Sequence, residues 1–206
     1  MSKYILHYFG TNGRACVPRA ILSYAKADWT NDIISFENWP KVKESGLCEF
    51  KQLPVLEVNG KKYCESQAIN LYLGETFNLM GKNAEENYQI INLLMTFEDI
   101  IKPSVEYLLN FNGSKTPENK KKCEEKLKLY IGQFEKRYLA QGKGKYFLGD
   151  KFTLADIFLG SALPNAFTAL EFKDFPFKDV APNLCQLIER ITKNELKEFH
   201  EKYFIK

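Results

Sequence analysis

The stretch Pro54-Val55-Leu56-Glu57-Val58-Asn59-Gly60-Lys61-Lys62-Tyr63-Cys64 decides the fold of this chain. Asn59 and Gly60 both tolerate positive φ, and such a pair between two strand-like runs is the strongest short-range signal for a β-hairpin. We therefore expect strands at 54–58 and 61–64. A helix over 66–77 follows the hairpin, so this region predicts a β-β-α unit.

The residues before the hairpin predict a β-α-β unit. An apolar run at 3–9 is typical of a strand, and the turn-forming residues 10–14 come directly after it. The spacing i, i+3, i+4, i+7 of one helix face is then occupied by Val17, Ala20, Ile21 and Tyr24. A second strand is expected around 32–36, and a short helical turn at 40–45. The two units together predict an α/β domain.

Strand signals vanish after residue 78, and only helical patterns follow. We expect a first domain at 1–78, a linker at 79–84 and an all-helical domain at 85–206. Its helices are predicted at 85–111, 117–139, 182–191 and 195–203, with a further helix that begins after Thr153. Thr116 and Pro117 are a typical cap and first-turn proline. Thr153 and Asp156 have the spacing of a capping box, which we interpret as a folding element.

Composition excludes several classes of protein. The chain has 206 residues and a net charge of +3, and its basic residues are scattered, so no footprint for nucleic acid stands out. The run at 120–122 is followed by acids and predicts a solvated helix face. Five cysteines without a C-x-x-C pair argue against a disulfide framework and a metal site. No run of about 18 apolar residues predicts a membrane span. We expect a cytoplasmic protein.

Tyr8 is the first candidate site residue, because it ends the first strand where ligands commonly bind in α/β sheets. Arg14 lies six residues further on, across a turn. A cis bond before Pro54 would present the Leu53 backbone to an extended peptide. Glu65 and Ser66 open a helix, where Ser66 can cap and the free amides form an anion site. These features suit a small peptide with carboxylates. With eleven tyrosines in the chain, a purely structural Tyr8 is the competing interpretation.

Five motifs in order carry a family resemblance. They are Tyr8-Phe9 with Gly13-Arg14-Ala15, Trp39-Pro40 with Lys43, the stretch 52–60, Glu65-Ser66-Gln67-Ala68-Ile69, and Phe152-Thr153-Leu154-Ala155-Asp156. Together they resemble the glutathione S-transferases, most closely the sigma class that includes the glutathione-dependent prostaglandin D synthases. The resemblance implies a thioredoxin-like N-terminal domain, a helical C-terminal domain and a homodimer. It also implies glutathione as co-substrate and no permanently bound cofactor.

The resemblance also implies roles for individual residues. Tyr8 is similar to the catalytic tyrosine, and Phe9 lies beside it. Three residues resemble the family's groups around the glycine end of glutathione, namely Arg14, Trp39 and Lys43. The residues that resemble the groups beside its cysteinyl backbone are Lys51, Gln52, Leu53 and Pro54. Those that resemble the groups at its γ-glutamyl end are Glu65, Ser66 and, from the partner subunit, Asp99. Sigma members usually have glutamine at the position of Glu65 and glycine at that of Lys51.

The implied chemistry is thiolate stabilisation. A thiol of pKa about 8.5 is only about 3% ionised at pH 7, whereas a tyrosine of pKa about 10 stays protonated and can donate to the sulfur. We expect conjugation of glutathione to hydrophobic electrophiles, with peroxide reduction or prostaglandin isomerisation as side activities. The second substrate's pocket should include Phe9, Tyr107 and Phe204.

Two other functions stay open at this point. One is a ligand carrier or structural protein on the same fold with little turnover. The other is a glutaredoxin-like oxidoreductase, which needs an exposed reactive cysteine. Cys16 is the rival nucleophile near a helix start, but its place inside the helix favours a buried structural thiol. His7 points to the opposite face of the strand from Tyr8 and is assigned no role.

Overall fold

The computed structural model describes residues 3–108, 110–169 and 176–204. The chain divides into two compact units, Met1–Leu79 with Asn194–Lys206, and Met80–Lys193. The chain's end therefore belongs with the first unit, whereas the sequence analysis assigns it to the helical domain. The reason is tertiary: helix α9 (Lys197–Tyr203) packs on helix α1 (Cys16–Tyr24) of the first unit. A helical period cannot show which partner a helix packs on.

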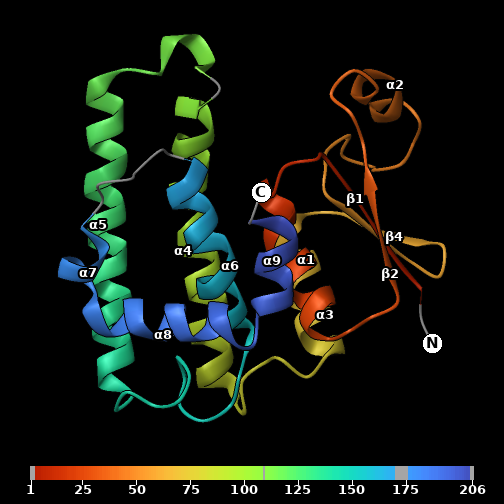
Figure 1. Ribbon diagram of the computed structural model, residues 1–206. Helices are drawn as coiled ribbons and strands as arrows, with labels where there is room; N and C mark the ends of the chain where they lie inside the picture. The colour runs from red at the N-terminus through yellow and green to blue at the C-terminus, as the bar shows by residue number, and fades with distance from the viewer. Residues whose placement is uncertain (1–2, 109, 170–175, 205–206) are drawn as a thin grey trace. The chain divides into compact units, whose positions relative to one another are not determined.

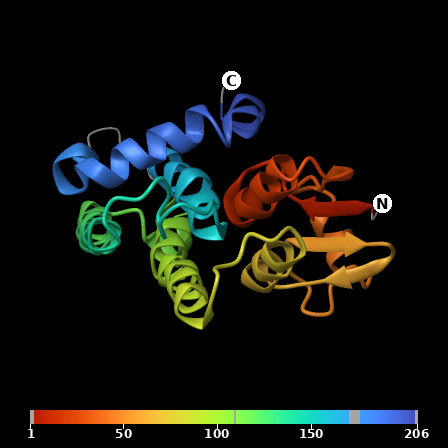
Figure 2. The same ribbon diagram turned by 90° about the horizontal axis from the view of Figure 1, so that it is seen from below.

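The first unit is built on a four-stranded mixed sheet. In the order β2-β1-β3-β4, the strands are Trp29–Ile33, Tyr4–Tyr8, Val55–Val58 and Lys61–Tyr63. β1 pairs parallel with β2 and antiparallel with β3, and β3 pairs antiparallel with β4. Figure 2 shows β3 and β4 as adjacent arrows. The hairpin around Asn59 and Gly60 is confirmed, and both residues have positive φ. This is the expected thioredoxin-like arrangement.

Helices α1 and α3 (Ser66–Thr76) lie together on one face of the sheet (Figure 1). The core between them and the strands is apolar. Its fully buried members include Leu6, Ile21, Leu56, Ile69 and Leu73. Each fully buried aliphatic side chain of this kind contributes about 1.5–3 kcal/mol. Helix α2 (Trp39–Lys43) is short and has no buried residue.

The second strand lies three residues earlier than the sequence predicts. The expected strand at 32–36 was wrong, because β1 pairs in parallel with 29–33, from Tyr4 opposite Trp29 to Tyr8 opposite Ile33. This edge strand has no buried residue, so hydrophobicity pointed instead to the apolar residues after it. Of those, Ile34 is buried while Phe36 is 68% exposed. Register with β1, not local composition, fixed the strand.

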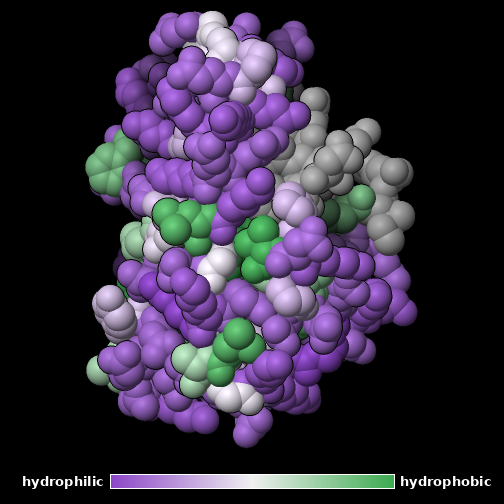
Figure 3. Space-filling view, turned by 90° about the vertical axis from the view of Figure 1, so that its left-hand side faces the viewer, coloured by the Kyte–Doolittle hydropathy of each residue, from purple (hydrophilic) through white to green (hydrophobic). Residues whose placement is uncertain are grey.

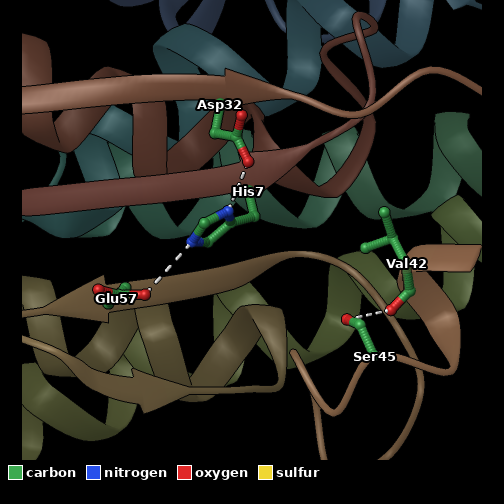
Figure 4. Close-up of polar contacts among 5 residues, drawn as sticks. All are labelled: His7, Asp32, Val42, Ser45 and Glu57. Atoms are coloured by element: carbon green, nitrogen blue, oxygen red, sulfur yellow. Dashed lines mark hydrogen bonds and ion pairs between the residues drawn. The ribbon is translucent and has the colours of Figure 1, made fainter. Parts of the chain in front are cut away.

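The other face of the sheet carries a polar cluster centred on His7. Its Nδ1 lies 2.7 Å from Asp32 Oδ2 on β2, and its Nε2 lies 3.8 Å from Glu57 Oε2 on β3. Figure 4 shows the imidazole between these two carboxylates, with Ser45 donating to the Val42 carbonyl nearby. His7 therefore links three strands on the face away from Tyr8. This placement agrees with the expectation that the His7 side chain points to the face opposite Tyr8.

The second unit is helical. Its helices are α4 (Ala84–Leu108), α5 (Pro117–Ala140), α6 (Leu154–Ala169), α7 (Phe177–Val180) and α8 (Pro182–Lys193). The Thr116 hydroxyl accepts the Asn119 N–H at 3.2 Å, which confirms the predicted cap of α5. The face that carries α5 and α7 is mostly hydrophilic, with a few separate apolar spots (Figure 3). Within the described parts of the chain, every helix is too short or too polar to cross a membrane.

Asp156 fastens the start of α6. Its carboxylate accepts the Phe147 N–H at 2.8 Å, the Thr153 N–H at 2.9 Å and the Thr153 hydroxyl at 3.0 Å. The predicted capping pair is therefore confirmed and is fully buried. Burial raises the pKa of the Asp156 carboxyl from 3.8 to about 6, and the three hydrogen bonds oppose that rise.

Replacing Asp156 should destabilise the second unit. Asp156→Ala leaves three buried donors without an acceptor, at about 1–3 kcal/mol each, so we expect the free energy of unfolding to fall by about 3 kcal/mol or more. Asp156→Asn keeps an acceptor and should lose less. Denaturant titration of both variants measures the difference, and equal stability of Asp156→Ala and wild type would contradict the role.

The raised pKa adds a pH dependence with a definite sign. The folded protein holds the Asp156 proton more tightly than the unfolded chain does, so this group's stabilisation is complete below about pH 4. It declines as the pH rises through about 6, the folded-state pKa. The stability gap between wild type and Asp156→Asn should therefore shrink from pH 4 to pH 7.

Candidate functional site

The expected site segments meet at one edge of the sheet. His7 pairs with Val55, so Pro54 at the start of β3 lies beside the end of β1, where Tyr8 stands. Leu56 pairs with Tyr63, so β4 returns to that same edge and leads there into residues 64–66. The sheet register thus brings together three segments that are more than forty residues apart from first to last.

Tyr8 is buried at the end of β1, and its hydroxyl oxygen accepts the Arg14 backbone N–H at 3.1 Å. The bond occupies the oxygen as an acceptor, which leaves the O–H hydrogen available to a ligand. Burial raises the pKa of the Tyr8 hydroxyl, while the Arg14 hydrogen bond and the charges of Arg14 and Arg19 oppose the rise. Tyr8 is therefore a neutral hydrogen-bond donor at physiological pH, not a base.

Gly13 makes the approach to Tyr8 possible. It begins a short 3₁₀ turn, Gly13–Ala15, with φ of +37°. A Cβ at this position would lie 2.6 Å from the Tyr8 hydroxyl oxygen and 3.2 Å from its Cε1. Only glycine lets the backbone pass this close to the phenol and place the Arg14 amide on it.

Arg19 is a supporting residue that the sequence analysis missed. Its guanidinium is 2% exposed and donates to the carbonyls of Phe9, at 2.9 Å, and of Thr11. Its Nε donates to Asn31 Oδ1 at 3.1 Å. Burial lowers the pKa of this guanidinium from its ordinary value. An arginine in a helix usually predicts an exposed charge. The sequence signal that could have indicated its burial was its position among the apolar residues of α1.

Arg19 holds the loop that follows Tyr8. It ties two carbonyls of that loop to α1, and its guanidinium carbon lies 5.7 Å from the Tyr8 ring centre and 5.6 Å from that of Tyr203 on α9. Asn12 of the same loop donates to the Tyr203 carbonyl at 3.2 Å. The loop is thus fixed from both helices, which keeps the phenol in one position.

An aromatic cluster adjoins Tyr8. The Phe9 ring lies 5.4 Å from the Tyr8 ring, stacks on Phe36 at 4.6 Å and meets the Trp39 ring edge-on at 5.7 Å. Trp39 begins α2 and is half-buried, and Lys43 ends α2 and is exposed. Phe9 therefore contacts Tyr8 directly, and Trp39 is linked to Tyr8 through Phe9. Positions i and i+4 put Trp39 and Lys43 on one side of α2.

Residues 51–54 lead into β3. The Leu53–Pro54 bond is cis, as the sequence analysis considered, and Pro54 is buried while Gln52 is exposed. Lys51 has φ of +53°, a conformation that favours glycine, which accounts physically for the glycine of the resembling proteins at this position. Its ammonium lies 2.5 Å from Glu44 Oε2, and this bond lowers the pKa of the exposed Glu44 carboxyl.

Glu65 and Ser66 open α3, but the expected capping by Ser66 was wrong. Glu65, with φ of +67° and an exposed side chain, is the N-cap residue, and Ser66 is already the first residue of the helix and buried. The Glu65 side chain makes no capping hydrogen bond within the part of the chain that the structure describes. The expectation for Ser66 was wrong because α3 begins at Ser66 itself, whereas a capping serine stands one residue before its helix. The N-terminus of α3 still lies at the edge of the sheet where Tyr8 stands, because β4 and β1 end at the same edge.

Asp99 lies on α4 in the second unit and is exposed. It accepts the Tyr130 hydroxyl of α5 at 3.1 Å, and burial raises the pKa of that tyrosine, with the Asp99 bond as the second cause. Tyr107 of the same unit lines a cavity of about 230 Å³ with residues of α4 and α5.

Two further expectations concern cysteine and metal. Cys16 is 1% exposed, which confirms a buried thiol at the start of α1. Within the described residues, no cluster of three or more histidine, cysteine or acidic side chains is arranged to hold a metal ion.

Comparison with known proteins now adds the family. Residues 5–75 match the model of the glutathione S-transferase N-terminal domain, and residues 98–202 match that of the C-terminal domain. The probable glutathione S-transferase 5 of Caenorhabditis elegans is 30% identical over 204 residues, which is 94% of this chain and 95% of that protein.

Two solved structures are also similar over nearly their whole length. Prostaglandin synthase D of Nilaparvata lugens has a TM-score of 0.80 at 28% identity, covering 99% of this chain and 100% of that one. Monomeric Na-GST-3, from the human hookworm Necator americanus, has a TM-score of 0.81 at 26% identity, covering 97% and 96%. A thioredoxin-like unit with a tyrosine at the end of its first strand, followed along the chain by a helical unit, defines one class. The chain belongs to the glutathione S-transferase family.

The contact between Gly13 and Tyr8 can be tested with two alanine substitutions. Gly13→Ala forces either the phenol or the turn to move, so we expect a loss of about 1–3 kcal/mol in the free energy of unfolding and a displaced Tyr8. Gly10→Ala is the matched control, because its Cβ would meet only Ile33 Cγ2 at 3.6 Å.

Denaturant titration gives the stability. The pKa of Tyr8 comes from the difference between the tyrosine absorbance titrations with and without the additional change Tyr8→Phe. In Gly13→Ala the loss of the Arg14 hydrogen bond should raise the pKa of Tyr8 further. An unchanged tyrosine titration and stability in Gly13→Ala would show that the close approach is dispensable.

Proposed function

We propose that this protein is a cytoplasmic, sigma-like glutathione transferase that joins the glutathione thiolate to hydrophobic electrophiles as a detoxification reaction. The observation that carries the proposal is the buried Tyr8 hydroxyl, which accepts from a backbone amide and keeps its own proton to donate. Family membership indicates that the bound peptide is glutathione. Tyr8, at the edge of the sheet, is the group that would stabilise its thiolate.

Tyr8 acts by stabilising an anion. Lowering the pKa of the bound thiol by about two units takes about 2.7 kcal/mol of preferential stabilisation of the thiolate. One hydrogen bond to a charged acceptor contributes about 1.5–3 kcal/mol, so a single phenol is of the right size. The Arg14 amide strengthens the donor by drawing electron density from the phenol oxygen. The raised pKa of Tyr8 keeps the proton on the oxygen, where it is needed.

The remaining residues of the edge bind the peptide. In this proposal the Arg14, Trp39 and Lys43 side chains hold the glycine carboxylate, because a guanidinium, an indole N–H and an ammonium all donate to carboxylates. The backbone at Gln52 and Leu53, with Lys51 and Pro54 beside it, pairs with the cysteinyl residue, as an extended peptide pairs with a strand edge. Phe9 forms the apolar wall next to Tyr8, which its ring contacts support.

The γ-glutamyl end carries both an ammonium and a carboxylate. The first amides of α3 and Ser66 favour the carboxylate, since helix N-termini attract anions. That assignment leaves the ammonium to Glu65, whose side chain is exposed at this end of α3. In a homodimer, Asp99 of the partner subunit would supply a second carboxylate to the ammonium.

Two finer features remain part of the proposal. Prostaglandin isomerisation or peroxide reduction would be side activities set by the identity of the second substrate. A homodimer is the proposed assembly. A monomeric protein is among the similar structures, so the assembly of this chain is to be measured by light scattering.

Tyr8→Phe tests the thiolate donor. Without the hydroxyl the bound thiol should return toward a pKa of about 8.5, and turnover at pH 7 should fall roughly 25-fold, the ratio of thiolate present at pKa 6.5 and at 8.5. Affinity for glutathione should change little. The measurement is the pH profile of turnover with an activated aryl chloride, together with calorimetric binding.

Tyr4→Phe is the matched control, because Tyr4 is a buried tyrosine on the same strand whose ring contacts Phe77, away from the site edge. Its turnover should equal that of wild type. Equal turnover and pH profile in Tyr8→Phe would remove Tyr8 from the mechanism. Retention on immobilised glutathione without conjugation of any electrophile would instead favour the carrier function.

Glu65→Gln tests the position of the γ-glutamyl ammonium. We expect weaker binding of glutathione, by up to about fivefold at low salt, because an exposed ion pair contributes up to about 1 kcal/mol and is screened by salt. Glu75→Gln, the same change near the other end of α3, should bind normally. Tighter binding in Glu65→Gln would mean that the acid faces the carboxylate.

A further inference from the structure

Two thiols lie in direct contact beside the proposed glutathione site. Cys48 Sγ and Cys64 Sγ are 2.9 Å apart. A disulfide needs about 2.05 Å, so the two sulfurs have only about 0.9 Å left to travel. Both cysteines are free in the structure. Cys48 is 6% exposed, and Cys64 is half-buried, so a reagent reaches Cys64 first.

The pair joins the two segments that carry the peptide-binding residues. Cys48 accepts the Lys51 N–H through its carbonyl at 3.0 Å, which closes the turn that leads into Gln52 and Leu53. Cys64 follows β4 and directly precedes Glu65, the N-cap of α3. A bond between the two sulfurs would therefore link the two sides of the proposed peptide groove.

We propose that Cys48 and Cys64 form a redox-sensitive dithiol, which a low-molecular-weight disulfide such as glutathione disulfide oxidises to an intramolecular disulfide, and that this bond weakens the peptide site. The modification site stands on the sulfur contact alone. Its effect on affinity rests on the proposed function.

The chemistry is thiol–disulfide exchange in two steps. The Cys64 thiolate attacks one sulfur of glutathione disulfide, forms a mixed disulfide and releases one glutathione thiolate. The Cys48 sulfur, after losing its proton, attacks the Cys64 sulfur, forms the internal disulfide and releases the second glutathione. The protein loses two electrons and two protons, and these convert one glutathione disulfide into two glutathione thiols.

The reaction should be slow at neutral pH. Burial, with the hydrogen bond to Cys48, raises the pKa of the Cys64 thiol to about 11, and the thiolate is the attacking species. The oxidation rate should therefore rise about tenfold per pH unit from pH 7 upward. Such a pair responds to sustained oxidation and stays reduced under brief exposure.

Closing the bond should disturb the groove. The two sulfurs must approach by about 0.9 Å, and the part of this that side-chain rotation does not absorb moves the backbone before Glu65 and the turn before Lys51. Displacements on the order of 1 Å cost about 100-fold in enzyme rates. We expect the dissociation constant of a thiol-free peptide ligand, S-hexylglutathione, to rise about tenfold or more on oxidation.

The experiment compares reduced and oxidised full-length protein. Wild type is incubated with glutathione disulfide at pH 8.5 and desalted, and peptide mass mapping locates the disulfide. Calorimetry then measures S-hexylglutathione binding in both forms. Cys48→Ser should stop at the mixed disulfide on Cys64 and gain one glutathionyl group, whereas Cys123→Ser, in the second unit, should form the internal disulfide like wild type.

The outcomes separate the two proposals. Absence of a link between Cys48 and Cys64 in wild type would overturn the modification site, and a link that leaves the affinity unchanged would overturn the regulation. If reduced wild type does not bind S-hexylglutathione, the proposed function and the regulation both fail, and the mass map still decides the modification site. Reversal by dithiothreitol, with recovery of affinity, is the expected final result.

Discussion

The pairing of β1 at the centre of the sheet is the constraint on which the rest of the structure depends. β1 bonds to β2 on one side and to β3 on the other, so the end of β1, the entry to β3 and the exit of β4 share one edge. A shift of one residue in the β1–β3 register would turn Tyr8 to the other face, because side chains alternate along a strand. The chemistry of the edge is thus a consequence of backbone pairing.

Tyr8 depends on three neighbouring residues that hold its phenol in place. Gly13 lets the backbone approach the phenol, and the Arg14 amide fixes the phenol oxygen. The buried Arg19 guanidinium binds a carbonyl of the loop after Tyr8 and lies near the Tyr203 ring of α9. A buried charge of this kind is stable only when its donors are satisfied, and Arg19 donates to three acceptors. The same desolvation that keeps Tyr8 protonated also lowers the pKa of Arg19.

The segments that lead into β3 and α3 differ from the loop after Tyr8 in their backbone conformation. Lys51 and Glu65 both adopt positive φ, which costs non-glycine residues roughly 1 kcal/mol each. These are also the two positions at which the chain departs from the sigma-class pattern that it resembles. Next to them, Cys48 and Cys64 place two thiols in contact. This part of the groove therefore combines local backbone strain with two thiols in contact, while the loop after Tyr8 is held by hydrogen bonds to α1 and α9.

The sequence by itself determined what local chemistry encodes. Asn59 and Gly60 specified the hairpin, the helical period specified α1 and the long helices, and Thr153 with Asp156 specified a cap, because each signal lies within a few residues. The order of five motifs determined the family. Only the tertiary structure decided the position of β2, the burial of Arg19, the contact between Cys48 and Cys64 and the packing of α9 on α1. Each of these joins residues distant in the chain, and pairing register and burial are properties of the assembled sheet and core that no local pattern carries.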